Sequence, residues 1–480
     1  MFIALKNARL LVVLVAVTVV ASCSNDNPSV AAPPDETVKM CRSAGAAGTI
    51  VDVPLSDVAA RKTQGDYVAS LVVDPASTRV GDSVHFKRIT DAVAVVRALR
   101  QKRTETVAAS CAVTINVAAG VYRGSTKDSS DATLEKFPIV LDMPGVALRG
   151  ALTMTLDAAL RANGAAPGSA VTTLTPVTGL VSDPVPDAIF VVNGHPNGSA
   201  GNDVTIEGFA LQSGHIGVDA DTGGFGVFGL RVKNLVVRGN RFEPTLSSAI
   251  DVRATDARIE NNTVAGGLLC DLCLAGPGTF SVSGNRIAKG GIDGVAVSSV
   301  IVLPVPAGVE QYTLPAAASA SATVFNNDIR DHLRVPVGVA VRVSAVGIGA
   351  PNVPQSTTLD VHDNTLANNT FALLYEAGFP VANTTLKGDL IVTMARNLIQ
   401  NSCQSDLMVT FNRHATTLGV AQLTRPYIRN SNYTISLGNN LRWEDVWYSN
   451  PSGFGNTLTV EGDTIGSGAH LAYLATKVCG

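Results

Sequence analysis

Val237-Arg-Gly-Asn240-Arg-Phe242 decides the fold, because its pattern of apolar-x-x-Asn-x-apolar recurs along the chain. A fixed self-similarity marks a repeat architecture. The other full copies are residues 259–264, 282–287, 324–329, 361–366 and 394–399. Degenerate copies are residues 206–211, with Phe209 at the Asn position, and residues 460–465, with Asp463 there.

The spacing of the copies indicates which repeat this is. Asn262 follows Asn240 by 22 residues and Asn285 follows Asn262 by 23, while the next gaps are 42 and 37 residues. Each copy alternates apolar and polar residues as a strand does. The sequence therefore predicts a parallel β-solenoid in which coils stack at about 4.8 Å. The longer gaps fit either one coil with a loop or two coils.

The recurrent Asn also has a predicted role. Asn tolerates left-handed backbone and can bond its counterpart one coil away, so stacked Asn side chains should form a ladder. Leucine-rich repeats also carry a fixed Asn, but their Leu-x-x-Leu-x-Leu signature is absent from this chain.

Composition limits the classes of function. The chain has 480 residues, 16% of them charged, and a formal net charge of -3. That length favours one long solenoid over three globular domains. The near-neutral charge predicts no nucleic-acid partner, and 5% aromatic residues is low for a sugar-stacking surface.

The first residues have the features of a targeting segment. A positive start with Lys6 and Arg9 precedes the apolar run 10–20, which is too short to span a membrane. Val20-Ala21-Ser22-Cys23 resembles a bacterial lipobox. The resemblance implies cleavage before Cys23 and lipidation of its thiol, and Ser24 at the next position implies an outer-membrane destination. An ordinary secretory signal with an incidental cysteine is the alternative.

These features divide the chain into four predicted parts. Residues 1–22 are a lipoprotein signal peptide, 23–45 a lipid anchor and flexible tether, 46–150 an N-terminal cap with the first coils, and 151–480 the β-helix with loop insertions and a C-terminal cap. The tether prediction rests on the polar, Pro-rich composition of residues 24–36.

Six cysteines remain after Cys23, which suits an oxidising compartment. Sequence order suggests three disulfides, one of about fifteen possible connectivities. The pairs are Cys41 with Cys111, Cys270 with Cys273, and Cys403 with Cys479. Cys270-Asp-Leu-Cys273 could instead be a redox or metal pair, although no second Cys-x-x-Cys is present.

Residues 84–100 form the one amphipathic helical pattern, with Thr90 or Asp91 near its start. A solenoid must cover its open end, so this helix is a predicted cap. The order Phe86-Lys-Arg-Ile-Thr-Asp-Ala-Val93, Ile115-Asn-Val-Ala-Ala-Gly-Val-Tyr122, Phe137-Pro-Ile-Val-Leu141, Gly145-Val-Ala-Leu-Arg-Gly150 resembles the start of pectin-lyase-like right-handed β-helix proteins. It is similar in particular to a bacterial domain of unknown function that opens exported β-helix proteins. The resemblance implies a right-handed, three-sheet β-helix with an N-terminal capping α-helix, and brings no activity.

The enzyme branches of this superfamily have catalytic motifs that can be looked for. The paired Asp and Arg motifs of pectinesterases and the Asp-Asp and His-Gly motifs of polygalacturonases are absent. Pectate lyases use Asp-bound calcium and Arg-x-Pro-x-x-Arg. Arg334-Val-Pro336 begins in the same way, but Val339 occupies the position of the second Arg.

Four acidic residues follow the recurrent Asn at similar offsets of 8 to 11 residues. Asp is unfavourable in a strand core, so we expect these side chains to face outward along one sheet or its turn. Such carboxylates could bind Ca²⁺ in a lyase or act as acid and base on a glycan. The candidate catalytic residues are Asp251, Asp271 and Asp293; the candidate ligand-binding residues are His215, Arg253, Lys289 and Asp406. The alternative is that these Asp residues are solvated turn residues.

Residues 442–448 concentrate the aromatic residues. Trp443 and Trp447 beside Glu444 and Asp445 could hold a sugar. The favoured alternative is that they cover the C-terminal end of the core.

The sequence thus predicts an exported, lipid-anchored β-helix of the bacterial cell envelope that binds a glycan or a cell-surface component. The alternative is a polysaccharide lyase or glycoside hydrolase using carboxylates on one sheet face. Whether the chain is an enzyme is left open. Expected partners are the membrane through Cys23 and a polysaccharide, with a monomeric chain, no metal and no cofactor except Ca²⁺ under the lyase alternative.

Overall fold

The computed structural model describes part of the compact unit Thr37–Gly480, together with Glu36. The described residues are 36–42, 49–79, 84–101, 111–125, 134–152, 172–176, 188–193, 203–212, 224–243, 248–267, 270–301, 316–333, 338–346, 353–378, 387–411, 430–438, 441, 446–450 and 452–470. The predicted signal peptide and Cys23 lie outside them. No helix in the described part is long and apolar enough to cross a membrane.

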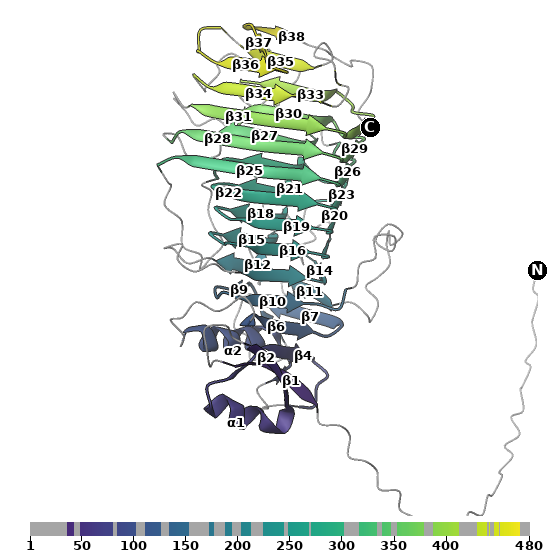
Figure 1. The fold of residues 1–480 in the computed structure, drawn as a ribbon. Coiled ribbons are helices and arrows are strands. Elements are labelled where there is room, and N and C mark those ends of the chain that lie inside the picture. The colour runs from purple at the N-terminus through teal and green to yellow at the C-terminus, as the bar shows by residue number, and fades with distance from the viewer. Residues whose placement is uncertain are drawn as a thin grey trace, which may run out of the picture. The chain divides into compact units, whose positions relative to one another are not determined.

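Three long sheets form the body of this unit (Figure 1). The 14-stranded sheet contains β4 (Ser70–Val73), β5 (His85–Phe86), β6 (Val113–Val117), β10 (Val146–Arg149), β13 (Val204–Glu207), β16 (Leu235–Arg238), β19 (Ala257–Glu260), β22 (Gly278–Ser283), β25 (Ala318–Phe325), β28 (Gln355–His362), β31 (Gly388–Ala395), β34 (Asn432–Ser436), β36 (Thr457–Val460) and β37 (Asp463–Ile465). The 10-stranded sheet contains β7 (Gly120–Ser125), β8 (Glu135–Lys136), β11 (Thr172–Pro176), β14 (Phe209–Leu211), β17 (Arg241–Phe242), β20 (Thr263–Ala265), β23 (Arg286–Ala288), β26 (Asp328–Arg330), β29 (Thr365–Ala367) and β32 (Leu398–Gln400). The 11-stranded sheet contains β9 (Ile139–Leu141), β12 (Ala188–Asn193), β15 (Phe225–Leu230), β18 (Ser248–Arg253), β21 (Cys270–Ala275), β24 (Asp293–Ser298), β27 (Val339–Val346), β30 (Phe371–Gly378), β33 (Ser405–Thr410), β35 (Trp447–Asn450) and β38 (Gly468–His470).

The predicted right-handed parallel β-helix is confirmed. Most coils contribute one strand to each sheet, and the strands of successive coils pair in parallel, as β16 does with β19. Because β22 pairs directly with β25 and β25 with β28, each long gap between repeats holds one coil plus an insertion. Residues 151–203, which have a loop-rich composition, also carry the strands β11 and β12.

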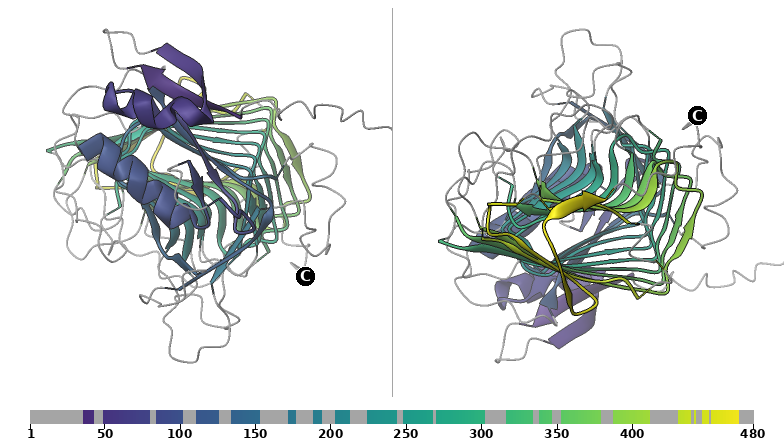
Figure 2. Two further views of the ribbon diagram at one scale, coloured as in Figure 1. Left: turned by 90° about the horizontal axis from the view of Figure 1, so that it is seen from below. Right: turned by 90° about the horizontal axis from the view of Figure 1, so that it is seen from above.

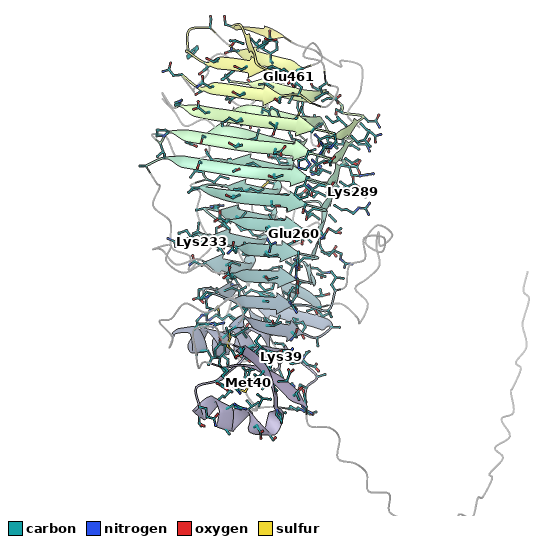
Figure 3. The ribbon with its side chains drawn as sticks, in the orientation of Figure 1. Lys39, Met40, Lys233, Glu260, Lys289 and Glu461 are labelled. Atoms are coloured by element: carbon teal, nitrogen blue, oxygen red, sulfur yellow. A yellow bond between two sulfur atoms is a disulfide. The ribbon has the colours of Figure 1, made fainter. Side chains whose placement is uncertain are left out.

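The apolar positions of the repeat form the core. Val237, Ile259, Val282 and Val324 are register partners on successive strands and are fully buried. Burial of apolar side chains stabilises the fold by about 25 cal/mol per Å² removed from water. The side chains between them on each strand point away from this core (Figure 3).

The recurrent Asn residues form the predicted ladder. The backbone N–H and the side-chain amide of Asn262 both donate to Oδ1 of Asn285, at 2.9 and 3.0 Å, and the same pattern continues from coil to coil. The ladder runs through Asn240, Asn262, Asn285, Asn327, Asn364 and Asn397. The left-handed backbone is one residue earlier than predicted, for example at Gly239 (φ 60°) and Asn261 (φ 55°).

Helix α2 (Ile89–Gln101) lies across the N-terminal end of the coils (Figure 2). It begins later than predicted, because His85–Phe86 forms β5. Its first turn is capped by Glu135 of β8, whose carboxylate accepts hydrogen bonds from Ile89 N at 2.6 Å and Thr90 N at 2.9 Å. The predicted capping helix is therefore present, with a cap residue that comes from a distant strand.

Five further elements precede α2 in the sequence. They are β1 (Thr37–Arg42), β2 (Thr49–Pro54) and β3 (Tyr67–Val68), which form a 3-stranded sheet, together with a short 3-10 helix (Leu55–Asp57) and α1 (Val58–Thr63). Since β1 is an ordered strand, the folded unit begins inside the segment 23–45 that was assigned to the tether.

The repeat ends in a different structure at the C-terminal side. Residues 460–465 were expected to form a degenerate coil copy, but β36 and β37 pair antiparallel through a turn at Glu461 and Gly462. Glu461 and Gly462 have φ angles of 50° and 90°, which a tight reversal requires.

Two disulfides lie within the described residues. Cys41 of β1 is bonded to Cys111, just before β6, and Cys270 is bonded to Cys273 within β21. Both pairs are those that sequence order suggested. Cys403 is also disulfide-bonded, and Cys479 lies outside the described residues.

Candidate functional site

The predicted acidic residues lie on the 11-stranded sheet, but they do not form one column. Asp251 is in register with Cys273, whereas Asp293 is in register with Cys270 at the start of the strand. Asp271 lies one position further along β21 than Cys270 and points toward the interior. Asp406 is at the second position of β33. The offsets from the recurrent Asn differ, and only Asp271 and Asp406, which share an offset of 9 residues, occupy the same position in their strands.

Asp251 forms a buried ion pair with Arg253 on the same strand. Nε and Nη2 of Arg253 donate to the two carboxylate oxygens at 2.9 and 2.8 Å. The guanidinium also lies 5.1 Å from the centre of the Phe228 ring, a cation–π contact. Two residues proposed for catalysis and binding are thus bonded to each other.

Asp293 belongs to a second buried ion network, with Arg342 of β27 and Glu376 of β30. Nε of Arg342 donates to Asp293 Oδ1 and Nη1 donates to Glu376 Oε1, each at 2.8 Å. Burial raises the pKa of Asp293 to about 6; the nearby Glu376 carboxylate adds to the rise, and Arg342 opposes it. The pKa of Asp293 is therefore well above the ordinary value for an Asp.

Asp271 is bonded inside the coils. Its Oδ2 lies 2.9 Å from His332 Nε2, its Oδ1 accepts the Gly267 N–H at 2.5 Å, and His332 Nδ1 is 3.1 Å from Asn369 Oδ1. Asp271 and His332 are both fully buried. A Cβ on Gly290 would collide with Asp271 and His332, so the backbone approaches this pair too closely for any side chain.

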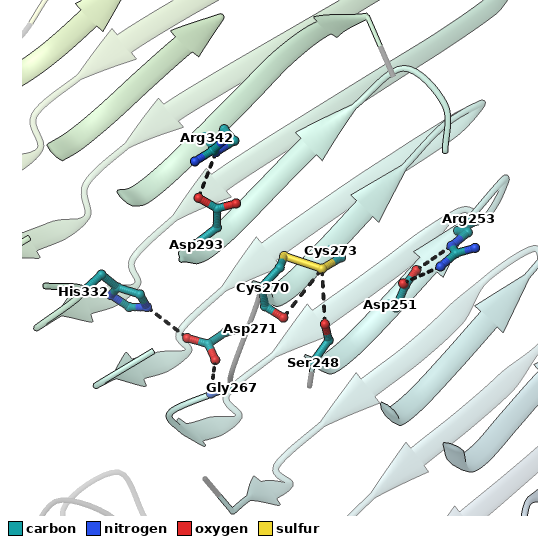
Figure 4. The surroundings of a disulfide bond; sticks show 10 residues. All are labelled: Ser248, Asp251, Arg253, Gly267, Cys270, Asp271, Cys273, Asp293, His332 and Arg342. Carbon is teal, nitrogen blue, oxygen red and sulfur yellow. Dashed lines mark hydrogen bonds and ion pairs between the residues drawn. A yellow bond between two sulfur atoms is a disulfide. The ribbon is translucent and has the colours of Figure 1, made fainter. Parts of the chain in front are cut away.

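Figure 4 shows the three arrangements together. The Cys270–Cys273 disulfide lies between the Asp251–Arg253 pair and the Asp293–Arg342 pair, while Asp271 turns toward His332. Cys273 Sγ is 3.5 Å from Ser248 Oγ on the neighbouring strand.

Apolar clusters flank these polar groups along the same sheet. One contains Phe228 and Leu230 of β15, and the other contains Phe371 and Leu374 of β30 together with Trp447 of β35. Trp447 is only 4% exposed and packs against Met408 and Leu374, as the core-covering alternative expects. Trp443 lies outside the described residues.

The expectation of solvent-facing acids is also wrong. Asp251, Asp271 and Asp293 are 5%, 0% and 7% exposed. Burial of a carboxylate is tolerated when a cation or a hydrogen-bond donor compensates the lost hydration, and each of the three has such a partner. Asp406 is half-buried.

The remaining predicted residues are not gathered around these acids. His215 lies outside the described residues, and Lys289 is exposed at the turn after β23, where Figure 3 labels it. The cation beside Asp293 is Arg342. Arg342, Glu376 and His332 were not among the predicted site residues. A signal existed for the first two, since each is the lone charge in an apolar strand.

Among the described residues, no group of three His, Cys, Asp or Glu side chains is placed to hold a metal ion. The three polar arrangements use carboxylates with Arg or His, which leaves those carboxylates committed to ion pairs and hydrogen bonds.

Comparisons with known proteins support the same class of fold. A family model described as "Right handed beta helix region" matches residues 225–414. No curated protein sequence matches the chain.

Solved structures give only distant likenesses. DFA-IIIase from Arthrobacter chlorophenolicus A6 is 13% identical with a TM-score of 0.42, covering 82% of this chain and 86% of that one. The same enzyme in complex with GF2 is 12% identical with a TM-score of 0.42, covering 82% and 88%. A pectate lyase is 11% identical with a TM-score of 0.33, covering 81% and 79%. Likenesses this weak support no inference about activity. The class that the fold defines is a right-handed parallel β-helix protein.

Proposed function

We propose that the chain is a non-catalytic β-helix, tethered to the bacterial envelope, that binds a glycan. The observation that carries the proposal is the commitment of all three candidate catalytic carboxylates to buried partners. Asp251 is bonded to Arg253, Asp271 to His332 and Asp293 to Arg342. A glycosidase needs two carboxylates that reach the same glycosidic bond from a groove, and these three have neither the exposure nor the freedom.

Binding suits the rest of the scaffold better. Parallel coils hold outward side chains at fixed intervals over a long sheet, and solenoids use such extended surfaces for recognition. Because rigid strands carry the contacts, the protein loses little conformational entropy when a long ligand binds.

The first test is a comparison of binding with activity. Protein comprising residues 24–480 is applied to a glycan array, and the same protein is screened against acidic and neutral polysaccharides, with and without Ca²⁺. Turnover is read from ultraviolet absorbance of new double bonds and from reducing ends. Binding without turnover is the expected result, and turnover would overturn the non-catalytic assignment.

The tether is tested separately. Lipidation of Cys23 predicts that the wild-type protein fractionates with membranes and incorporates labelled fatty acid, while Cys23→Ser does neither. A wild-type protein found entirely in the soluble fraction would exclude the anchor and leave the binding proposal unchanged.

One observation favours a second candidate, a polysaccharide hydrolase or lyase. Asp293 and Glu376 flank one guanidinium, and the pKa of Asp293 is raised to about 6. A carboxyl whose pKa is raised by burial is suited to general acid catalysis in mildly acidic solution. If the screen finds turnover that Asp293→Asn abolishes and Asp406→Asn leaves intact, this candidate replaces the first.

A further inference from the structure

The outer face of the 14-stranded sheet changes character along the solenoid. From β22 to β36 its outward positions carry mainly hydroxyl and amide side chains. We call this set of residues the hydroxyl face. It comprises Thr279, Ser281, Ser319, Ser321, Thr323, Ser356, Thr358, Thr393, Asn432, Thr434, Ser436, Thr457 and Thr459, with Asp360, Asp389 and Ile391 among them.

Strand register places these side chains on a two-dimensional lattice. One column is formed by register partners in series, Thr279 with Ser321, Ser321 with Thr358, Thr358 with Ile391, and Ile391 with Thr434. Neighbouring strands are about 4.8 Å apart, and alternate residues along a strand are about 6.6 Å apart. Six strands therefore extend the hydroxyl face over about 24 Å along the solenoid.

The residues of the hydroxyl face are accessible. Thr279, Ser321, Thr358 and Thr434, one on each of four strands, are exposed. The residues that follow them on the same strands are buried in the core. Each exposed hydroxyl can donate one hydrogen bond and accept two. The face thus offers donors and acceptors at positions that the sheet backbone determines.

Charge separates this face from the earlier coils of the same sheet. There, Arg149 and Arg238 flank Glu207, with ion-pair distances of 2.6 and 2.5 Å. On the hydroxyl face, Asp389 is paired with Lys387 at 2.9 Å, and Asp360 accepts the Thr393 hydroxyl at 3.1 Å. The face therefore presents hydrogen-bonding groups with little net charge.

An aromatic pair borders the lattice. The rings of Phe325 and His362 are register partners on β25 and β28 and stack with centroids 5.3 Å apart at an interplanar angle of 16°. Both are half-buried and lie on the outer side of the sheet. The two rings cover one face of each other, so the pair gives an apolar border beside the hydroxyl donors, and a sugar ring has both apolar and polar surfaces that could contact them.

We propose that the hydroxyl face binds a neutral, ordered polysaccharide laid along successive coils, through hydrogen bonds between its lattice and the sugar hydroxyls. This inference rests on the proposed glycan-binding function and names the surface and the substrate class. The ligand is neutral because the face offers hydroxyls in place of the cations that acidic sugars need. The ligand is ordered because a rigid array gains most from a partner that loses little entropy on binding.

The test uses a pair of isosteric substitutions. Thr358→Val together with Thr434→Val removes two hydroxyls that flank Ile391 and keeps the β-branched shape that suits a strand. The matched control is Thr263→Val together with Thr365→Val on the outer side of the 10-stranded sheet, where both side chains are half-buried. Thermal unfolding establishes that both variants are folded.

Binding is measured by sedimentation with insoluble cellulose and insoluble chitin, and by titration with soluble polygalacturonate. We expect wild-type binding to at least one insoluble neutral polysaccharide, a loss of about tenfold in the Thr358/Thr434 variant, no change in the control, and little sensitivity to salt. Each lost hydrogen bond to a neutral group corresponds to about 0.5–1.5 kcal/mol, and 1.4 kcal/mol is a factor of ten.

The outcomes separate the two proposals. Binding only to polygalacturonate, unchanged by the Thr358/Thr434 substitutions, would overturn this inference and leave the glycan-binding function standing. Absence of binding to every glycan would overturn both. Inhibition of ice growth by the wild type, lost in the variant, with no glycan bound would assign the lattice to ordered water and also overturn the inference.

Discussion

Asn327 illustrates how much one residue of the ladder does. Its side-chain amide donates to Val282 O at 2.9 Å and to Asn364 Oδ1 at 3.0 Å, and its Oδ1 accepts the Asn285 N–H at 2.9 Å. Asn327→Ala would leave buried backbone groups in two coils without these partners. We expect a loss of about 2–4 kcal/mol in the free energy of unfolding, measured by urea denaturation.

The control for this prediction is Asn432→Ala. Asn432 is exposed at the start of β34, so its removal should change stability by less than about 0.5 kcal/mol. Equal effects of the two substitutions would show that the ladder contributes nothing special to stability.

Asp293 gives stability a pH dependence of unusual sign for a carboxylate. Its pKa in the folded chain, about 6, is above the ordinary 3.8, so the folded state binds the proton more tightly than the unfolded state. The stabilising contribution is complete below about pH 4 and is lost as the pH rises through 6. Each pKa unit corresponds to about 1.4 kcal/mol, so Asp293→Asn should remove a decline on the order of 2 kcal/mol between pH 4 and 6.

Asp363 is the matched control, because its shift has the opposite sign. Hydrogen bonds from Arg396 and His362 lower the pKa of this exposed carboxylate to about 2. Its contribution is present above the ordinary pKa and is lost as the pH falls toward 2. Asp363→Asn should lower stability by a constant amount above about pH 4 and should remove pH dependence only below that value, so it leaves the decline between pH 4 and 6 unchanged. A decline between pH 4 and 6 that survives in Asp293→Asn would show that another group causes it.

At the scale of the element, α2 depends on a residue far away in sequence. Glu135 accepts hydrogen bonds from Ile89 N, Thr90 N and the Thr90 hydroxyl. Glu135→Ala should therefore cost about 1–2 kcal/mol, the usual value for a lost N-cap. Urea unfolding followed by circular dichroism measures it.

Asp142→Ala provides the comparison, because Asp142 also contacts this helix from another segment. Asp142 pairs with Arg97 at 2.7 Å in a largely exposed salt bridge, so its loss should cost less than about 1 kcal/mol. If the two variants were equally stable, Glu135 would not be acting as the cap.

The type of each element could be predicted from the sequence, but the side chains that contact it from distant segments could not. The Asn repeat and the alternation in β16, β19 and β22 predict buried strands in register, and the structure has them. The pattern predicts that inward and outward side chains alternate, but it does not say which of two consecutive residues in β21 points inward. In β21, Cys270 faces outward and Asp271 faces inward at consecutive positions, and nothing local distinguishes them. The partner His332 is 61 residues away, so the burial of Asp271 could not be inferred from its own segment.

At the scale of the whole unit, the two described disulfides should differ in effect. Cys41 and Cys111 are separated by 70 residues, and Cys270 and Cys273 by three. On the chain-entropy view, the longer loop contributes about 4 kcal/mol and the shorter one much less. Replacing Cys41 and Cys111 by Ser should therefore lower the unfolding midpoint more than the same change at Cys270 and Cys273.

The loss should also be localised. Coils of a solenoid contact chiefly their neighbours, so hydrogen exchange should increase first in β1, β2 and β3, where Cys41 lies, with little change in the distant coils. A uniform increase through all three long sheets would instead mean that the unit unfolds as a single cooperative body.

The Asn ladder has a consequence for how such a chain can change length. Every rung donates in one direction, from Asn240 to Asn262, then to Asn285 and onward to Asn397. Because each amide donates to the next rung and to a carbonyl of the preceding coil, a duplicated segment of one repeat would bring its own donor and its own acceptor. Growth by whole coils therefore replaces the bond at the insertion point by two of the same kind, whereas the insertion of a partial coil would interrupt the series at that point.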